Sequence, residues 1–106
     1  MAKEILDLSE GMDIFDMLDI RNQALIKVTV QSLQALFAGR DLPNHKIKGT
    51  RGQIDSFLKT LMREKKYMSS VIENGLEDPR TYRQKAYLDV ATRNFKTQTG
   101  MEWPIG

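Results

Sequence analysis

The sequence predicts an all-α fold, a bundle of three main helices over residues of about 13–38, 51–74 and 79–97. Two observations support this class. Residues 50–76 combine a helix start signal, an unbroken apolar period of three and four, and a stop signal. A second start signal, Asp78 followed by Pro79, comes directly after them. At 106 residues the chain fits a single domain, assigned to 13–106, with an acidic arm at 1–12 and a short Trp-Pro tail.

The acidic arm is the first unusual feature. Residues 1–20 hold one lysine and six carboxylates for a net −5, whereas 21–106 hold fifteen bases and eight acids for a net +7. The acids recur at every third position, a spacing that would spread them around the whole surface of a helix. We therefore expect a loose or short-helical arm through Gly11, followed by a helix that starts near Asp13. This segment is either a docking element or an N-terminal helix that packs on its own core. The docking anchors would be Ile14, Phe15, Met17 and Leu18.

The first main helix contains few charges. Between residues 22 and 38 only Lys27 is charged, and Gly39 is a suitable terminator. Six apolar side chains share one face: Leu25, Ile26, Val30, Leu33, Leu36 and Phe37. Such a helix is expected to be covered on more than one side. It is either the central helix of the monomer or, on its glutamine side, an oligomer seam. Residues 40–49 are predicted to form a loop.

The second main helix has clear boundaries. Thr50 and Gln53 have the spacing of a capping box, and Asn74-Gly75 offers a left-handed stop with Leu76 folding back on the last turn. Its predicted apolar face comprises Ile54, Phe57, Leu58, Leu61, Met62, Met68, Val71 and Ile72.

The third main helix is expected to bury one apolar side and to end at Thr99-Gly100. The buried side comprises Tyr87, Leu88, Val90, Ala91 and Phe95. On the opposite side, the pairs Lys85–Asp89 and Asp89–Arg93 have the spacing of helix-face ion pairs. Trp103, close to Pro104, is predicted to pack back on the bundle and hold the tail down.

Basic residues form the second candidate site. Together they would make one positive surface that tracks a phosphate backbone, with Tyr67 and Tyr82 available for base stacking. The alternative is an ordinary solvated face, because Asp55 and Glu64 interrupt the charge. The glycine-containing basic loop before Arg51 is either an anion site at a helix start or simply a capped loop. The candidate residues are Lys46, Lys48, Arg51, Lys59, Arg63, Lys66, Arg80, Arg83, Lys85, Arg93 and Lys96.

Enzymatic and membrane functions have no support in the sequence. There is no cysteine, and the single histidine, His45, lacks the neighbours of a zinc site, so no metal, cofactor or catalytic residue is assigned. Residues 24–30, the longest apolar run, are far shorter than the roughly 20 residues of a membrane span. The N-terminus does not resemble a signal peptide, so the expected location is the cytoplasm.

Two phrases, GTRGQIDSFLKTLMREKKYM at 49–68 and TGMEWPIG at 99–106, resemble those of short, uncharacterised helical proteins encoded by bacteriophages. The resemblance implies a small accessory protein in the host cytoplasm that binds nucleic acid, a host enzyme or a virion part. The leading functional hypothesis is a non-enzymatic protein-interaction module that associates with itself and engages a partner protein. The alternative is a nucleic-acid-binding protein with little base specificity.

Overall fold

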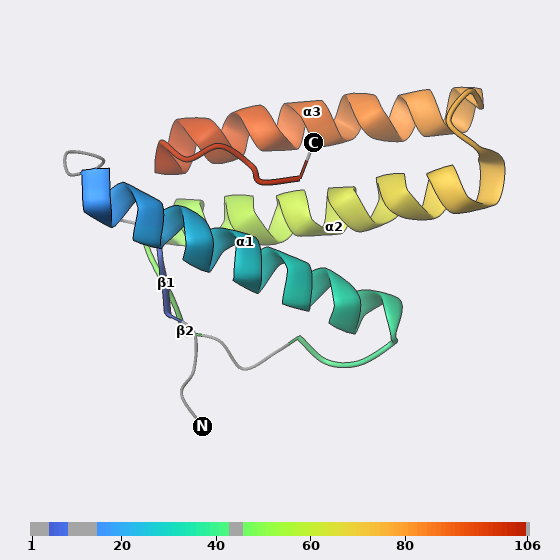
Figure 1. The fold of residues 1–106 in the computed structure, drawn as a ribbon. Helices are drawn as coiled ribbons and strands as arrows, with labels where there is room; N and C mark the ends of the chain where they lie inside the picture. Colours follow the sequence, from blue (N-terminus) through green and yellow to red (C-terminus); the bar gives the residue numbers. More distant parts are fainter. Residues whose placement is uncertain (1–4, 9–14, 43–45, 106) are drawn as a thin grey trace.

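In the computed structural model, three helices account for most of the chain, which confirms the all-α prediction (Figure 1). The structure describes residues 5–8, 15–42 and 46–105, with the backbone alone for Ile5 and residues 15–22. The elements are β1 (Ile5–Asp7), α1 (Phe15–Phe37), β2 (Lys46–Lys48), α2 (Arg51–Asn74) and α3 (Pro79–Thr99). Helices α2 and α3 form an antiparallel hairpin, and α1 packs on α2. The central helix is therefore α2, and the expectation that the first helix is central is wrong.

The ends of α2 follow from local chemistry. The capping box forms as predicted: the Thr50 hydroxyl accepts from the Gln53 N–H (3.2 Å), and the Thr50 N–H donates to Gln53 Oε1 (2.8 Å). At the other end Gly75 has φ 88° and ψ 164°, a conformation open to glycine but not the left-handed helical one. Leu76 is 62% exposed and lines a hollow together with Val71 and Ile72 of the last turn.

The predicted signals also bound α3. Asp78 caps its first turn by accepting from the Arg80 N–H (2.8 Å), with Pro79 at the first helical position. Gly100 ends the helix in the left-handed conformation, at φ 73° and ψ 5°.

The seam between α2 and α3 is lined by small polar side chains. The buried Thr60 hydroxyl donates within α2 to the Ser56 carbonyl oxygen (2.7 Å) and lies 3.1 Å from the Ala91 carbonyl oxygen of α3. Nearer the connecting turn, the Ser70 and Thr81 hydroxyls are 2.8 Å apart. Because these side chains are short and their hydroxyls have partners, the two helices can pack closely without leaving those groups unsatisfied.

Three aromatic rings form the centre of the core. The Trp103 ring lies 5.8 Å from Phe57 of α2 and 5.3 Å from Phe95 of α3, the latter edge to face. Trp103 therefore packs on the bundle, as predicted. The same cluster contains Met101 from the tail, Leu61 from α2, Leu25, Val28 and Leu33 from α1, and two residues near the N-terminus, Leu6 and Leu8.

Two short strands correct the predictions for the arm and for the loop. β1 pairs in parallel with β2, with Leu6 opposite Ile47, and the Leu8 N–H donates to the Lys48 carbonyl oxygen (2.8 Å). Leu6 and Leu8 are fully buried because alternate residues of a strand face the same side. Residues 5–8 are thus extended and belong to the core of the domain, not to a loose or short-helical arm.

Helix α1 buries a different face from the one predicted. Leu25 and Leu33 are buried, but Ile26 and Phe37 are 49% and 44% exposed. Of the predicted docking anchors, Ile14 and the side chains of Phe15, Met17 and Leu18 lie outside the described residues. The structure therefore leaves their role as a hypothesis.

Replacing Trp103 with alanine should lower the free energy of unfolding by about 3–5 kcal/mol, as for other buried aromatic side chains. The loss has two causes, the cavity between Phe57 and Phe95 and the lost indole N–H donor for Glu64. Urea unfolding measures it. Tyr82→Ala, at a site 61% exposed, is the matched control and should stay within about 0.5 kcal/mol of wild type. A Trp103→Ala loss below about 1 kcal/mol would show that the tail does not hold the core.

Candidate functional site

A groove runs along one side of the α2–α3 hairpin. It consists of two adjoining hollows of about 750 and 540 Å³ that share Met62 and Lys66. The first is lined mainly by Leu58, Lys59, Met62, Arg63, Lys66, Tyr87, Val90, Ala91 and Asn94, and the second mainly by Lys65, Lys66, Ser69, Glu73, Asn74, Arg80, Arg83 and Gln84. We call the surface lined by these residues the α2–α3 groove.

The α2–α3 groove is strongly basic. Six bases line it, Lys59, Arg63, Lys65, Lys66, Arg80 and Arg83, against one carboxylate, Glu73. The spacings on α2 are three and four residues, which bring Lys59, Arg63 and Lys66 to one side of the helix. Within the described residues, no ion pair engages these three bases or Arg83. The groove therefore has uncompensated positive charge along much of its length.

Glu64 does not contribute to this groove, although it lies between bases in the sequence. Its side chain is buried and its Oε1 accepts from the Trp103 indole N–H at 3.0 Å. Burial raises the pKa of Glu64, while the indole hydrogen bond and the Lys85 charge act in the opposite direction. The prediction that Glu64 interrupts the exposed basic charge is wrong, because the core of the bundle takes up this carboxyl.

Large apolar side chains are exposed in the same groove. Met62 is 45% exposed, Tyr87 45% and Val90 58%, and Leu58 lies beside them at 36%. The prediction that Tyr87 and Val90 are on the buried side of their helix is wrong. Because α2 and α3 meet through the small side chains of the seam, these larger residues remain at its edge. The Arg63 guanidinium lies 4.9 Å from the centre of the Tyr87 ring, a cation–π contact that fixes both side chains in the groove wall.

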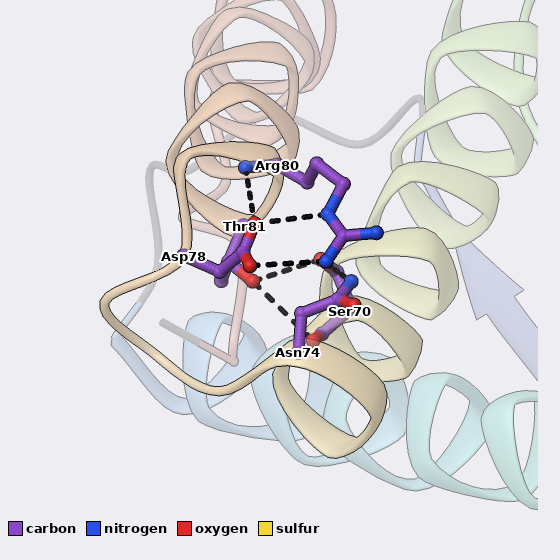
Figure 2. Close-up of polar contacts among 5 residues, drawn as sticks. All are labelled: Ser70, Asn74, Asp78, Arg80 and Thr81. Atoms are coloured by element: carbon purple, nitrogen blue, oxygen red, sulfur yellow. Dashed lines mark hydrogen bonds and ion pairs between the residues drawn. The ribbon is translucent and has the colours of Figure 1, made fainter.

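A cluster of polar contacts lies at the turn between α2 and α3 (Figure 2), where Asn74 and Arg80 line the end of the groove. Arg80 donates from Nε and Nη2 to the two carboxylate oxygens of Asp78, at 3.0 and 3.1 Å. This guanidinium, more than any other group, lowers the pKa of the Asp78 carboxyl. Beside it Asn74 donates to the Ser70 hydroxyl, which also contacts Thr81. The charge of Arg80 is therefore largely compensated, and the available bases are those farther along the groove.

The remaining predicted bases lie elsewhere. Lys85, Arg93 and Lys96 line a separate hollow beside Trp103 on the other side of α3. Lys85 pairs with Asp89 at 3.4 Å, as predicted, whereas Arg93 donates from Nε to the main-chain oxygen of Asp89 at 3.3 Å. Lys96 pairs with Glu102. This group is therefore partly neutralised.

Three more predicted bases, Lys46, Lys48 and Arg51, lie on β2 and at the first residue of α2. An anion bound at this helix start would need free backbone N–H groups. The N–H groups of Thr50 and Gln53 are already engaged in the capping box. The eleven predicted bases thus form separate groups, and only five of them line the α2–α3 groove.

The predicted stacking pair does not line the groove either. Tyr67 lies under the Lys85 ammonium, 5.4 Å from the ring centre, and Tyr82 is not among the groove residues. The aromatic residue of the groove is Tyr87. Sequence periodicity placed it in the core, because a tyrosine that recurs with leucine and phenylalanine cannot be distinguished from a core residue.

No cluster of three or more His, Asp and Glu side chains that could hold a metal ion occurs in residues 5–8, 15–42 and 46–105. His45 lies outside that part of the chain. None of the helices in the described ranges is both long and apolar enough to cross a bilayer.

Protein-family models, curated proteins and solved structures were each compared with the chain, and none of them matches it. The α2–α3 groove and the other exposed surfaces are therefore the features that bear on function.

Replacing Glu64 with glutamine should change how stability depends on pH. Because the pKa of Glu64 is raised in the folded protein above its ordinary 4.5, wild-type stability falls as pH rises from 4.5 through the folded-state pKa and levels off above it. Glutamine keeps an acceptor for Trp103 without the charge. Urea unfolding at several pH values should therefore show the variant gaining on wild type as pH rises.

The control for this experiment is Glu64→Leu, which should share the altered pH profile but lose stability, because the buried indole N–H then has no acceptor. A constant difference between Glu64→Gln and wild type from pH 4 to 8 would contradict the assignment.

Proposed function

We propose that this protein is a non-enzymatic protein-interaction module that binds an acidic amphipathic helix of a partner protein in the α2–α3 groove. The observation that carries the proposal is the presence, in one groove, of four exposed apolar side chains and of five bases that form no ion pair among the described residues, Lys59, Arg63, Lys65, Lys66 and Arg83. Carboxylates of the partner would meet the bases, and its apolar residues would cover the side chains of Leu58, Met62 and Val90.

A helix is the ligand shape that suits the groove. The groove follows the line between two packed helices, so a third helix lying along it would complete a three-helix contact. Apolar residues at positions i, i+3, i+4 and i+7 of the partner would face Met62 and Val90. Glutamates or aspartates flanking that stripe would pair with Lys59 and Lys66 at the rim of the groove. The long lysine side chains can adjust their positions to meet these carboxylates.

The resemblance to small phage-encoded proteins supports the same function. It suggests an accessory protein that acts in the host cytoplasm on a host or virion protein. The acidic N-terminal segment of residues 4–20, with the anchors Ile14, Phe15, Met17 and Leu18, is a second docking hypothesis on the same chain.

An acidic amphipathic peptide, labelled with fluorescein and carrying leucines on one helical face and glutamates on the other, tests the proposal by fluorescence anisotropy. Val90→Ser and the double variant Lys59→Glu/Lys66→Glu should each weaken binding at least about tenfold, which corresponds to about 1.4 kcal/mol. The first removes apolar contact and the second reverses the rim charge.

The matched control is Lys85→Glu/Lys96→Glu, on the other side of α3, which should bind like wild type. Equal binding by the groove variants and this control, or equal binding of a scrambled peptide of the same composition, would refute the groove as the site.

Nucleic acid is the second candidate ligand, and the polar half of the groove favours it. Lys66 and Arg83 line this half together with Ser69, which suits phosphate contact, and Tyr87 in the other half offers a ring for stacking. The exposed Met62 and Val90 argue against it, because apolar side chains gain nothing from a phosphate backbone.

If nucleic acid binds, four phosphate contacts should make the logarithm of the binding constant fall with that of salt concentration at a slope of roughly −3. A salt titration with a labelled single strand and a labelled duplex measures it. Replacing Lys59, Arg63 and Lys66 with glutamate should then abolish binding, whereas Val90→Ser should leave it unchanged. A slope near zero would eliminate this function.

A further inference from the structure

A second exposed apolar surface lies where the end of α1 meets the C-terminal half of α2. Two hollows of about 570 and 400 Å³ share Phe37 and Met68 there. We name this the Phe37 surface; its principal residues are Val30, Gln34, Phe37, Met68, Ile72 and Leu76. Ile72 is 77% exposed and Leu76 62%, among the most exposed large apolar side chains of the described chain.

The Phe37 surface carries no charge. None of the described residues that line its two hollows is acidic or basic, although 28% of the whole chain is charged. It also shares no lining residue with the α2–α3 groove. An exposed apolar patch without charges is typical of the centre of a lasting protein interface.

Helix α1 has an exposed stripe on its outer side. Its inner side packs on β1, α2 and the core, whereas Ile26, Val30, Gln34 and Phe37 face outward, and within residues 5–8, 15–42 and 46–105 the stripe has only edge contacts with α2 and Ile105. Between residues 23 and 37 the helix has one charged residue, Lys27. Covering the exposed apolar side chains of this stripe with another apolar surface would therefore be favourable.

We propose that the Phe37 surfaces of two copies of this protein pack together about a two-fold axis. A second copy fits because, under two-fold symmetry, a patch must complement itself, and an uncharged apolar patch does so without any matching of charges. The alternative face for self-association is the α2–α3 groove, where the bases of two copies would repel one another. The dimer leaves both grooves open.

Analytical ultracentrifugation over a wide concentration range tests this inference. Wild type should sediment as a species of twice 12.2 kDa that dissociates on dilution. Phe37→Glu and Ile72→Glu each place a charge within the apolar interface and should each weaken dimerisation at least about a hundredfold. Both sites are exposed in the monomer, so the variants should keep the wild-type circular dichroism spectrum. Tyr82→Glu is the matched control and should dimerise like wild type.

A chain without cysteine permits a second, independent measurement. Single cysteines at Gln34 and Ile72, cross-linked by a short bismaleimide, should give covalent dimers at low concentration, whereas Asn94→Cys in the groove should not. Wild type that stays monomeric at every concentration would overturn the inference. So would a dimer that resists Phe37→Glu and Ile72→Glu, or one that Val90→Glu dissociates.

The peptide assay keeps this inference separate from the proposed function. Phe37→Glu should bind the acidic peptide like wild type, because the α2–α3 groove is untouched. Loss of peptide binding in Phe37→Glu would contradict the independence of the two surfaces.

Discussion

The contact between Trp103 and Glu64 is the constraint on which both the core and the exposed chemistry of this protein depend. The indole ring fills the space between Phe57 and Phe95, and its N–H holds the carboxyl of Glu64 inside. Without that donor a buried carboxyl in a three-helix core would be unsatisfied. The same contact holds the Glu64 carboxyl inside the core and away from the α2–α3 groove, so the groove side of α2 is more basic than the sequence of the helix suggests. A tail residue thereby sets the electrostatics of a groove that it does not line.

The parts of the fold that sequence predicts well are those fixed by neighbouring residues. The capping box of Thr50 and Gln53, the Asp78-Pro79 start and the Gly100 stop place the ends of α2 and α3 within about two residues, because each signal acts across a single turn. Packing of the tryptophan was also predictable, since a large ring beside a proline has few alternatives to burial.

The parts that sequence does not predict depend on which elements meet. Periodicity shows that α2 and α3 each have an apolar face, but not which residues of the two helices meet. The helices pack through Ser56 and Thr60 of α2, and Met62, Tyr87 and Val90 therefore remain exposed. Most of the predicted basic residues are exposed, whereas Arg63 and Lys85 are half-buried. Their division between the two sides of α3 depends on how that helix is rotated about its axis, which sequence does not show. The alternation of Leu6 and Leu8 with Asp7 was a visible strand signal, obscured by the three-residue spacing of the acids.

The pairing of β1 with β2 also bears on how the chain reaches this structure. It pairs Leu6 with Ile47, so the loop between the two strands contains about 40 residues, including all of α1. Closing a loop of this length costs chain entropy. The α2–α3 hairpin needs only a short turn. Folding should therefore begin at the C-terminal hairpin, with α1 and the N-terminal strand docking later. Since α1 adds its apolar stripe to the Phe37 surface only in that late step, the complete surface exists only once the whole chain has folded.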